Sequence, residues 1–105
     1  MSDAEQDAAI LRLVKERSEA KKRRNLLESE LAVAGRTFSE IGKALAQLDA
    51  PNTVTLGAPD YALKEIDEAP EICSLGKVKD MLVELKNLRV RVSELDRRAA
   101  QLGVD

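Results

Sequence analysis

The fold is decided by residues 10–48, which read ILRLVKERSEAKKRRNLLESELAVAGRTFSEIGKALAQL. Apolar and small side chains recur in this stretch with alternating spacings of three and four residues, and two arginines stand in the same series. An average period of 3.5 residues sustained over several heptads requires a partner helix that winds around the first with a left-handed supercoil. The series consists of Ile10, Leu13, Arg17, Ala20, Arg24, Leu27, Leu31, Ala34, Phe38, Ile41, Leu45 and Leu48.

The ends of this first helix are marked in the sequence. Ser2-Asp3-Ala4-Glu5 matches the capping box, in which the serine and the glutamate side chains each satisfy a backbone N–H of the other. Asp3 and Glu5 also place negative charge in the first turn, where it complements the helix dipole. Pro51 ends the run at its other side. We therefore predict a helix over about residues 3–48.

A second apolar series predicts another helix over about residues 74–102. Ser74 is placed to cap its start, and Gly103 is placed to stop it. The series consists of Val78, Met81, Leu85, Leu88, Val92, Leu95, Ala99 and Leu102.

The connection over residues 49–72 has a different composition, because Pro51, Gly57, Pro59 and Pro70 break the period. Residues 53–56 are rich in β-branched side chains, and residues 60–68 are compatible either with a short helix or with the return strand of a hairpin. Good helix formers in the second of these segments slightly favour the helix.

Antiparallel packing sets the a positions of one helix against the d positions of the other. One register that achieves this places Leu48 opposite Val78 and Leu27 opposite Ala99. It leaves residues 3–20 without an intrachain partner. We therefore predict an all-α chain that forms a single antiparallel coiled-coil hairpin, with a long first helix and a shorter second one. Because a two-helix hairpin buries little core for its length, we expect it to assemble into a dimeric helical bundle.

Composition narrows the function. In 105 residues, 34% are charged and only 2% are aromatic, which is typical of long helices and coiled coils. There is no histidine and one cysteine, so the commonest general base, the commonest metal ligand and an intrachain disulfide are missing. We therefore expect no catalytic residues, no cofactor and no metal. The sequence has no apolar run long enough to predict a membrane span. With a single cysteine, we expect a reducing, cytoplasmic location.

Apolar residues outside the predicted helix pair are candidates for binding a protein partner. Some lie in the arm that the predicted register leaves unpaired, and burying each is worth roughly 1.5–3 kcal/mol. Others form two heptad-spaced pairs on outward faces. The candidates are Ile10, Leu11, Leu13, Val14, Leu26, Val33, Val83 and Val90.

A basic segment over residues 15–24 suggests a surface for phosphates or acidic proteins. The alternative is a solvated helix face on which arginine stems cover the apolar series. A net charge of −2 for the whole chain does not favour nucleic acid as a partner. The connection is acidic, so the two ends of the predicted hairpin carry opposite charge. The basic candidates are Lys15, Arg17, Lys21, Lys22, Arg23, Arg24, Arg97 and Arg98.

In outline, the order of helix, β-prone connection and helix is similar to the subunits of prefoldin-type chaperones, which present coiled-coil arms from a β-built base. The resemblance rests on no diagnostic motif, and it implies a holdase activity toward unfolded segments. The sequence itself favours a non-enzymatic structural or adaptor protein that binds protein partners and forms a homodimer. A nucleic-acid-associated protein that uses residues 15–24 is the third hypothesis.

Overall fold

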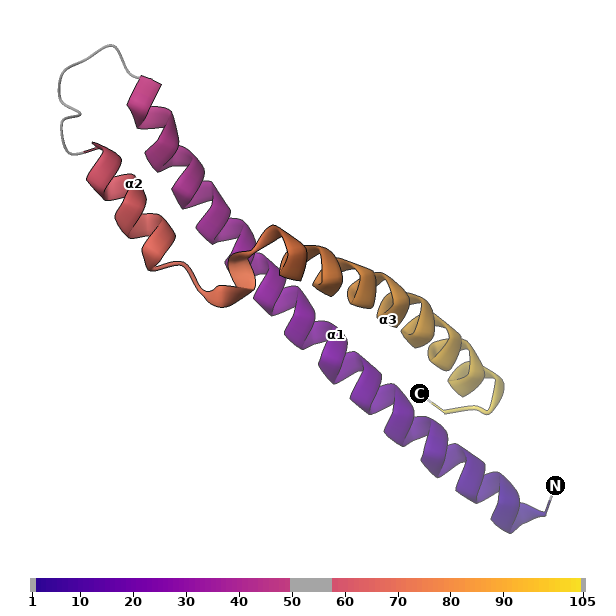
Figure 1. Cartoon of the computed structure of the whole chain (residues 1–105). Coiled ribbons are helices and arrows are strands. Elements are labelled where there is room, and N and C mark those ends of the chain that lie inside the picture. The colour runs from indigo at the N-terminus through magenta and orange to yellow at the C-terminus, as the bar shows by residue number, and fades with distance from the viewer. Residues whose placement is uncertain (1, 50–57, 105) are drawn as a thin grey trace. The chain divides into compact units, whose positions relative to one another are not determined.

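The structure is a computed structural model that describes residues 2–49 and 58–104. Every regular element in these residues is helical, so the predicted all-α class is confirmed (Figure 1). The elements, in chain order, are helix α1 over Asp3–Ala46, the 3-10 turn η1 over Gln47–Asp49, helix α2 over Ala58–Asp67, the 3-10 turn η3 over Glu71–Cys73 and helix α3 over Leu75–Gln101.

Serine side chains cap the starts of both long helices. The backbone N–H of Glu5 donates a hydrogen bond of 3.2 Å to the Oγ of Ser2, which is one half of the capping box. The N–H of Lys77 donates a bond of the same length to the Oγ of Ser74. Each cap satisfies a backbone donor that the first turn of a helix cannot pair internally, and so fixes where the helix begins.

The end of α3 is a glycine turn that folds the chain back on itself. Gly103 has a positive φ of 72°, a backbone conformation that glycine adopts without steric cost. The N–H of Val104 donates to the carbonyl of Ala99 at 2.8 Å, and the N–H of Gly103 donates to that of Ala100 at 3.2 Å. These two bonds form the Schellman motif. As a result, Val104 packs back against the buried cluster that contains Ala99.

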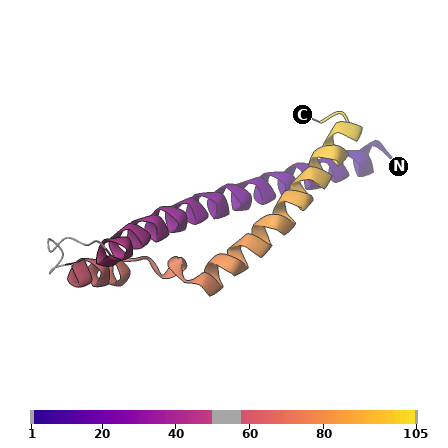
Figure 2. The same ribbon diagram turned by 90° about the horizontal axis from the view of Figure 1, so that it is seen from above.

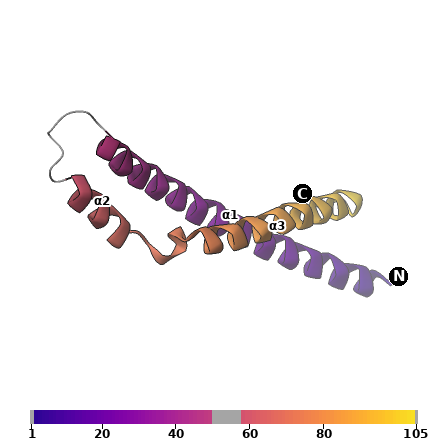
Figure 3. The same ribbon diagram turned by 45° about the horizontal axis from the view of Figure 1, so that its top comes forward.

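The chain divides into two compact units, one built from Met1–Ser29 with Met81–Asp105 and the other from Glu30–Asp80. In the first unit, the N-terminal part of α1 and the C-terminal part of α3 run beside each other in opposite directions (Figures 2 and 3). Their core is a cluster of Leu13, Leu95 and Ala99, against which Ala20 packs from the next turns of α1.

The pairing within the first unit corrects the predicted register. Ala99 lies in the cluster with Leu13, whereas the sequence-based register placed it opposite Leu27, two heptads further along α1. The expectation that residues 3–20 have no intrachain partner is therefore wrong. Leu13 is only 7% exposed, and Arg17 bonds to Asp96 of α3.

In the second unit, α2 packs beside η1 and the C-terminal end of α1 (Figure 1). The buried side chains here are small, namely Ala34, Ala44 and Ala62. Leu45 and Leu48, predicted to continue the apolar series, are 46% and 48% exposed. The residue that is buried at this end of α1 is Ala44, the neighbour of Leu45.

The connection folds as the helical alternative. Of residues 60–68, which are compatible with a return strand, all but Glu68 lie in α2, and no strand occurs in the described ranges 2–49 and 58–104. The β-prone run over residues 53–56 lies outside the described residues. The first helix, predicted over residues 3–48, is α1, which ends at Ala46 and is followed by η1. The second, predicted over residues 74–102, is α3, which extends over Leu75–Gln101.

Candidate functional site

Two rows of ion pairs flank the apolar contact between α1 and α3 in the first unit. On one side, Arg91 donates a hydrogen bond of 3.0 Å from Nη2 to the Oε2 of Glu16. On the same side, Arg23 holds both carboxylate oxygens of Glu84, at 2.6 Å from Nε and 3.0 Å from Nη2. The two pairs are one heptad apart: Arg23 lies seven residues after Glu16 on α1, and Glu84 lies seven residues before Arg91 on α3. The sign of the charge alternates along each helix.

The opposite side repeats this arrangement. The Nζ of Lys21 lies 3.2 Å from the Oδ1 of Asp96, and Nη2 of Arg89 lies 3.6 Å from the Oε1 of Glu28. Arg17, from the apolar series itself, donates a 2.7 Å bond from Nε to the same oxygen of Asp96. Asp96 is thus held by two cations from successive turns of α1.

This alternation explains why the helices pair where they do. Sliding α3 by one heptad along α1 in one direction would bring Glu16 opposite Glu84. Sliding it in the other direction would bring Arg23 opposite Arg91. Such like-charge neighbours oppose association, whereas the observed pairs are all attractive.

The register predicted from the apolar series alone is disfavoured for the same reason. It would set Arg23 opposite Arg98 and leave Asp96 opposite Gly35, so the observed ion pairs would be lost and only Arg91, opposite Glu30, would gain a new one. The apolar layers match in both registers, and the charges on the flanks distinguish them.

The bonded cations lower the pKa of two carboxyl groups. Hydrogen bonding from Arg23 holds the pKa of Glu84 below its ordinary value. Hydrogen bonding from Arg17, followed by that from Lys21, does the same to the pKa of Asp96. Both shifts have the sign expected when a neighbouring cation stabilises the ionised form of a carboxyl group.

Half of the predicted basic surface is engaged in these rows. Arg17, Lys21 and Arg23 bond to acids of α3, and the Nε of Arg24 lies 3.8 Å from Glu28 on its own helix. In the described ranges, the remaining basic candidates form no ion pair. These are Lys15, Lys22, Arg97 and Arg98.

The apolar candidates separate into buried and exposed groups. Leu13 belongs to the core, and Ile10 and Val33 are half-buried. Leu11 is 71% exposed and Val14 43% exposed, on the side of α1 that faces away from this core. The outward residues Leu26, Val83 and Val90 are each about half exposed, as their heptad positions predicted.

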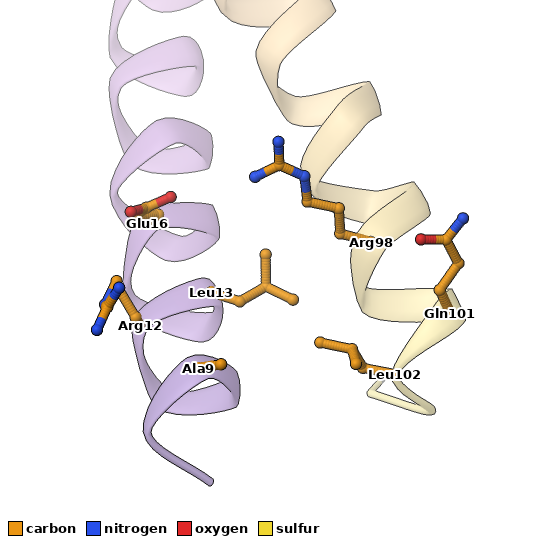
Figure 4. Close-up of a pocket in the computed structure, with 7 residues that line it drawn as sticks. All are labelled: Ala9, Arg12, Leu13, Glu16, Arg98, Gln101 and Leu102. Atoms are coloured by element: carbon orange, nitrogen blue, oxygen red, sulfur yellow. The ribbon is translucent and has the colours of Figure 1, made fainter. Parts of the chain in front are cut away.

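A groove of about 400 Å³ opens between the two helices at the start of α1. Figure 4 shows Leu13 and Leu102 pointing toward each other from the two helices, with Arg98 reaching toward α1 beside them. The groove lies one heptad beyond the Glu16–Arg91 pair, where Ala9 provides no carboxylate to Arg98. Its wall residues are Ala9, Arg12, Leu13, Glu16, Arg98, Gln101 and Leu102.

A second hollow, of about 380 Å³, follows a single face of α1. It is lined by one apolar side chain, Val14, and by polar and cationic ones that include Lys21 and Lys22. An amphipathic segment with negative charge has the complementary chemistry, because the hollow offers methyl groups next to ammonium groups.

Helix α2 carries an exposed apolar surface that the sequence did not identify as a site. Leu63 is 58% exposed and Ile66 is 48% exposed, while Ala62, which precedes Leu63, is buried. Asp60 and Asp67 lie on the outer side of the same helix and are exposed. The sequence signal that could have identified this surface is the small side chain of Ala62, which marks the face of α2 that is buried.

Other kinds of site find no support in the described residues. No group of three or more histidine, cysteine, aspartate or glutamate side chains in ranges 2–49 and 58–104 is arranged to hold a metal ion. Within the same ranges, no helix combines the length and the apolar character that crossing a bilayer requires. No protein-family model, curated protein or solved structure matches the chain.

Proposed function

We propose that this chain is a non-enzymatic coiled-coil adaptor that binds other protein chains, a second copy of itself included. The proposal treats α1 and α3 as an antiparallel coiled-coil hairpin whose register is set by the two rows of ion pairs. The hairpin then serves as a rigid support that presents apolar side chains on its outer faces.

The observation that carries this proposal is the imbalance between buried and exposed apolar side chains. Of the large apolar residues in the described ranges, Leu27 and Leu95 alone are fully buried. Leu11, Leu63 and Val90 are each more than half exposed. Exposed apolar groups at helical spacing are typical of surfaces that associate with other helices, since their burial against a partner stabilises the complex.

Sedimentation equilibrium over micromolar to millimolar concentrations tests the proposal. We expect the average mass to rise with concentration, and the double variant Leu11→Gln/Val90→Gln to associate more weakly than the parent. Lys86→Gln, at an exposed position without an ion pair in the described residues, is the matched control. A single-chain mass at every concentration would contradict the self-association that we propose.

The holdase hypothesis has fewer exposed apolar residues to support it than the sequence suggested. It relied on an unpaired apolar arm, and in the structure Leu13 of that arm is buried, which leaves Leu11 and Val14 to grip a client. If this activity exists, Leu11→Gln/Val14→Gln should reduce the suppression of client aggregation while the helical circular dichroism signal stays unchanged.

The nucleic-acid hypothesis rests on the four basic candidates that form no ion pair in the described residues, among them Lys15 and Lys22. Binding through phosphate contacts weakens steeply as salt rises. Fluorescence anisotropy with a labelled single-stranded oligonucleotide, read at low and at physiological salt, measures that dependence directly.

A further inference from the structure

Two exposed stripes in this molecule have the same spacing and opposite charge. On α1, Leu11 is followed by Val14 and then by Lys15. On α2, Leu63 is followed by Ile66 and then by Asp67. Each stripe therefore has apolar side chains at the first and fourth positions and a charge at the fifth. Positions spaced by three and four residues lie on one face of a helix.

The charges in each stripe continue in the same chain direction. On α1, Lys22 lies two turns beyond Lys15 on the same face, and on the other segment Glu68 follows directly after Asp67. In the described residues none of these four side chains forms an ion pair. All four are exposed, so each is accessible to a partner of opposite charge.

The apolar members are exposed as well. Leu11 and Leu63 are 71% and 58% exposed, and Val14 and Ile66 are 43% and 48% exposed. Val14 also borders the hollow on α1 that includes Lys22, which gives the basic stripe a concave edge. The two surfaces thus match in the spacing of their apolar residues and of the first charge, and their charges are opposite in sign.

We propose that the α2 stripe of one copy, Leu63, Ile66, Asp67 and Glu68, docks on the α1 stripe of a second copy, Leu11, Val14, Lys15 and Lys22. The inference rests on the self-association proposed above and names the surfaces that carry it. The helices pack side by side in the same direction, so that Leu63 meets Leu11, Ile66 meets Val14 and Asp67 meets Lys15. Charge complementarity selects this pairing over two copies of either stripe.

The contact is heterologous, because each copy contributes a different surface. A heterologous contact leaves a free α2 stripe on one copy and a free α1 stripe on the other, so association continues into rings or open chains instead of stopping at a dimer. Sedimentation velocity should therefore show a series of species that grows with concentration. Added salt should weaken the series, because the paired charges lie at the surface.

Charge reversal with mixing tests the pairing. Lys15→Glu/Lys22→Glu gives a chain whose stripes are both acidic, and Asp67→Lys/Glu68→Lys gives a chain whose stripes are both basic. Each variant alone should lose at least tenfold in association constant, while an equimolar mixture of the two should recover most of it. Lys86→Glu and Asp80→Lys, at exposed residues outside both stripes, should leave association unchanged, and circular dichroism should confirm equal helix content throughout.

The outcomes separate this inference from the proposed function. If the parent chain associates but both reversal variants associate equally well, another face is used and the docking model is overturned. If the mixture fails to recover association, the pairing of these two stripes is wrong. If the parent is a single chain at all concentrations, the proposed self-association fails first. If Lys15→Glu/Lys22→Glu abolishes binding of an oligonucleotide and leaves self-association intact, the α1 stripe serves nucleic acid instead.

Discussion

Arg17 donates a hydrogen bond of 2.7 Å to Asp96, although it stands in the same heptad series as the buried residues Leu13 and Leu27. Its side chain is only 21% exposed, and its charged end reaches the flank where Asp96 lies. An arginine can occupy such a position because its aliphatic stem is apolar and its guanidinium is long enough to reach an acid. Asp96 is thereby linked to two successive turns of α1, since Lys21 binds the same oxygen.

The pairing of Asp96 predicts acid sensitivity. Because its cations lower the pKa of Asp96 in the folded state, the stabilisation is complete above the unfolded pKa of roughly 4 and is lost as pH falls through the folded pKa. The unfolding temperature of the parent should therefore fall below about pH 4. Asp96→Asn should unfold at a lower temperature than the parent at neutral pH, and this difference should shrink in acid. Asp80→Asn is the control, and a difference independent of pH would contradict the role of the charge.

The buried cluster of the first unit predicts a graded response to truncation. Leu95 is fully buried, so Leu95→Ala should lower the free energy of unfolding by about 2–5 kcal/mol. Leu102 belongs to the same apolar series but is 42% exposed, and Leu102→Ala should cost clearly less. Urea unfolding followed by circular dichroism measures both. Equal losses at the two positions would show that burial in this cluster does not determine stability.

The pair of Glu16 and Arg91 predicts rescue by charge exchange. Glu16→Arg places like charges together at an exposed contact and should destabilise the chain by less than about 1 kcal/mol. Adding Arg91→Glu should restore the attraction in the reversed sense. A double-mutant cycle on thermal unfolding gives the coupling energy, and additive effects of the two changes would mean that the residues do not interact.

The glycines inside α1 predict stabilisation by alanine. A Cβ built at Gly35 or Gly42 meets nothing within 4 Å, so the substitution adds no clash and removes conformational freedom from the unfolded chain. Each of Gly35→Ala and Gly42→Ala should raise the free energy of unfolding by about 0.5–1 kcal/mol. Gly103→Ala should instead destabilise, because Gly103 has a positive φ. A loss of stability at Gly35 would indicate that another chain packs closely against that face.

The apolar pattern was sufficient to predict the class of fold and several buried positions. Leu13, Leu27, Leu85 and Leu95 are buried where the two heptad series placed them. The choice of register needed more information, since layers of leucine, valine and alanine fit equally well after a shift of two heptads. Only the alternating charges at the flanks distinguish the two, and they become informative once Glu16 and Arg91 are considered as a pair.

The candidate surface was predictable only in part for a related reason. Val83 and Val90 lie outward because their positions follow from the period of α3 alone. The exposure of Leu11 beside the burial of Leu13 depends on which turn of α3 lies opposite, and hence on the register. The surface of α2 depends on its contact with η1, which no periodic signal in ten residues could define.

The two rows of ion pairs also make the helices equivalent to each other. Both helices carry an acid, a base five residues later, a second base two residues after that, and an acid five residues further on. An antiparallel pair in which both members carry one motif has a pseudo-twofold axis, so α3 of a second copy would satisfy the charges of α3 as well as α1 does. The same pattern that prevents the helices from sliding would therefore permit their exchange between molecules. The corresponding residues are Glu16, Lys21, Arg23 and Glu28 on α1, and Glu84, Arg89, Arg91 and Asp96 on α3.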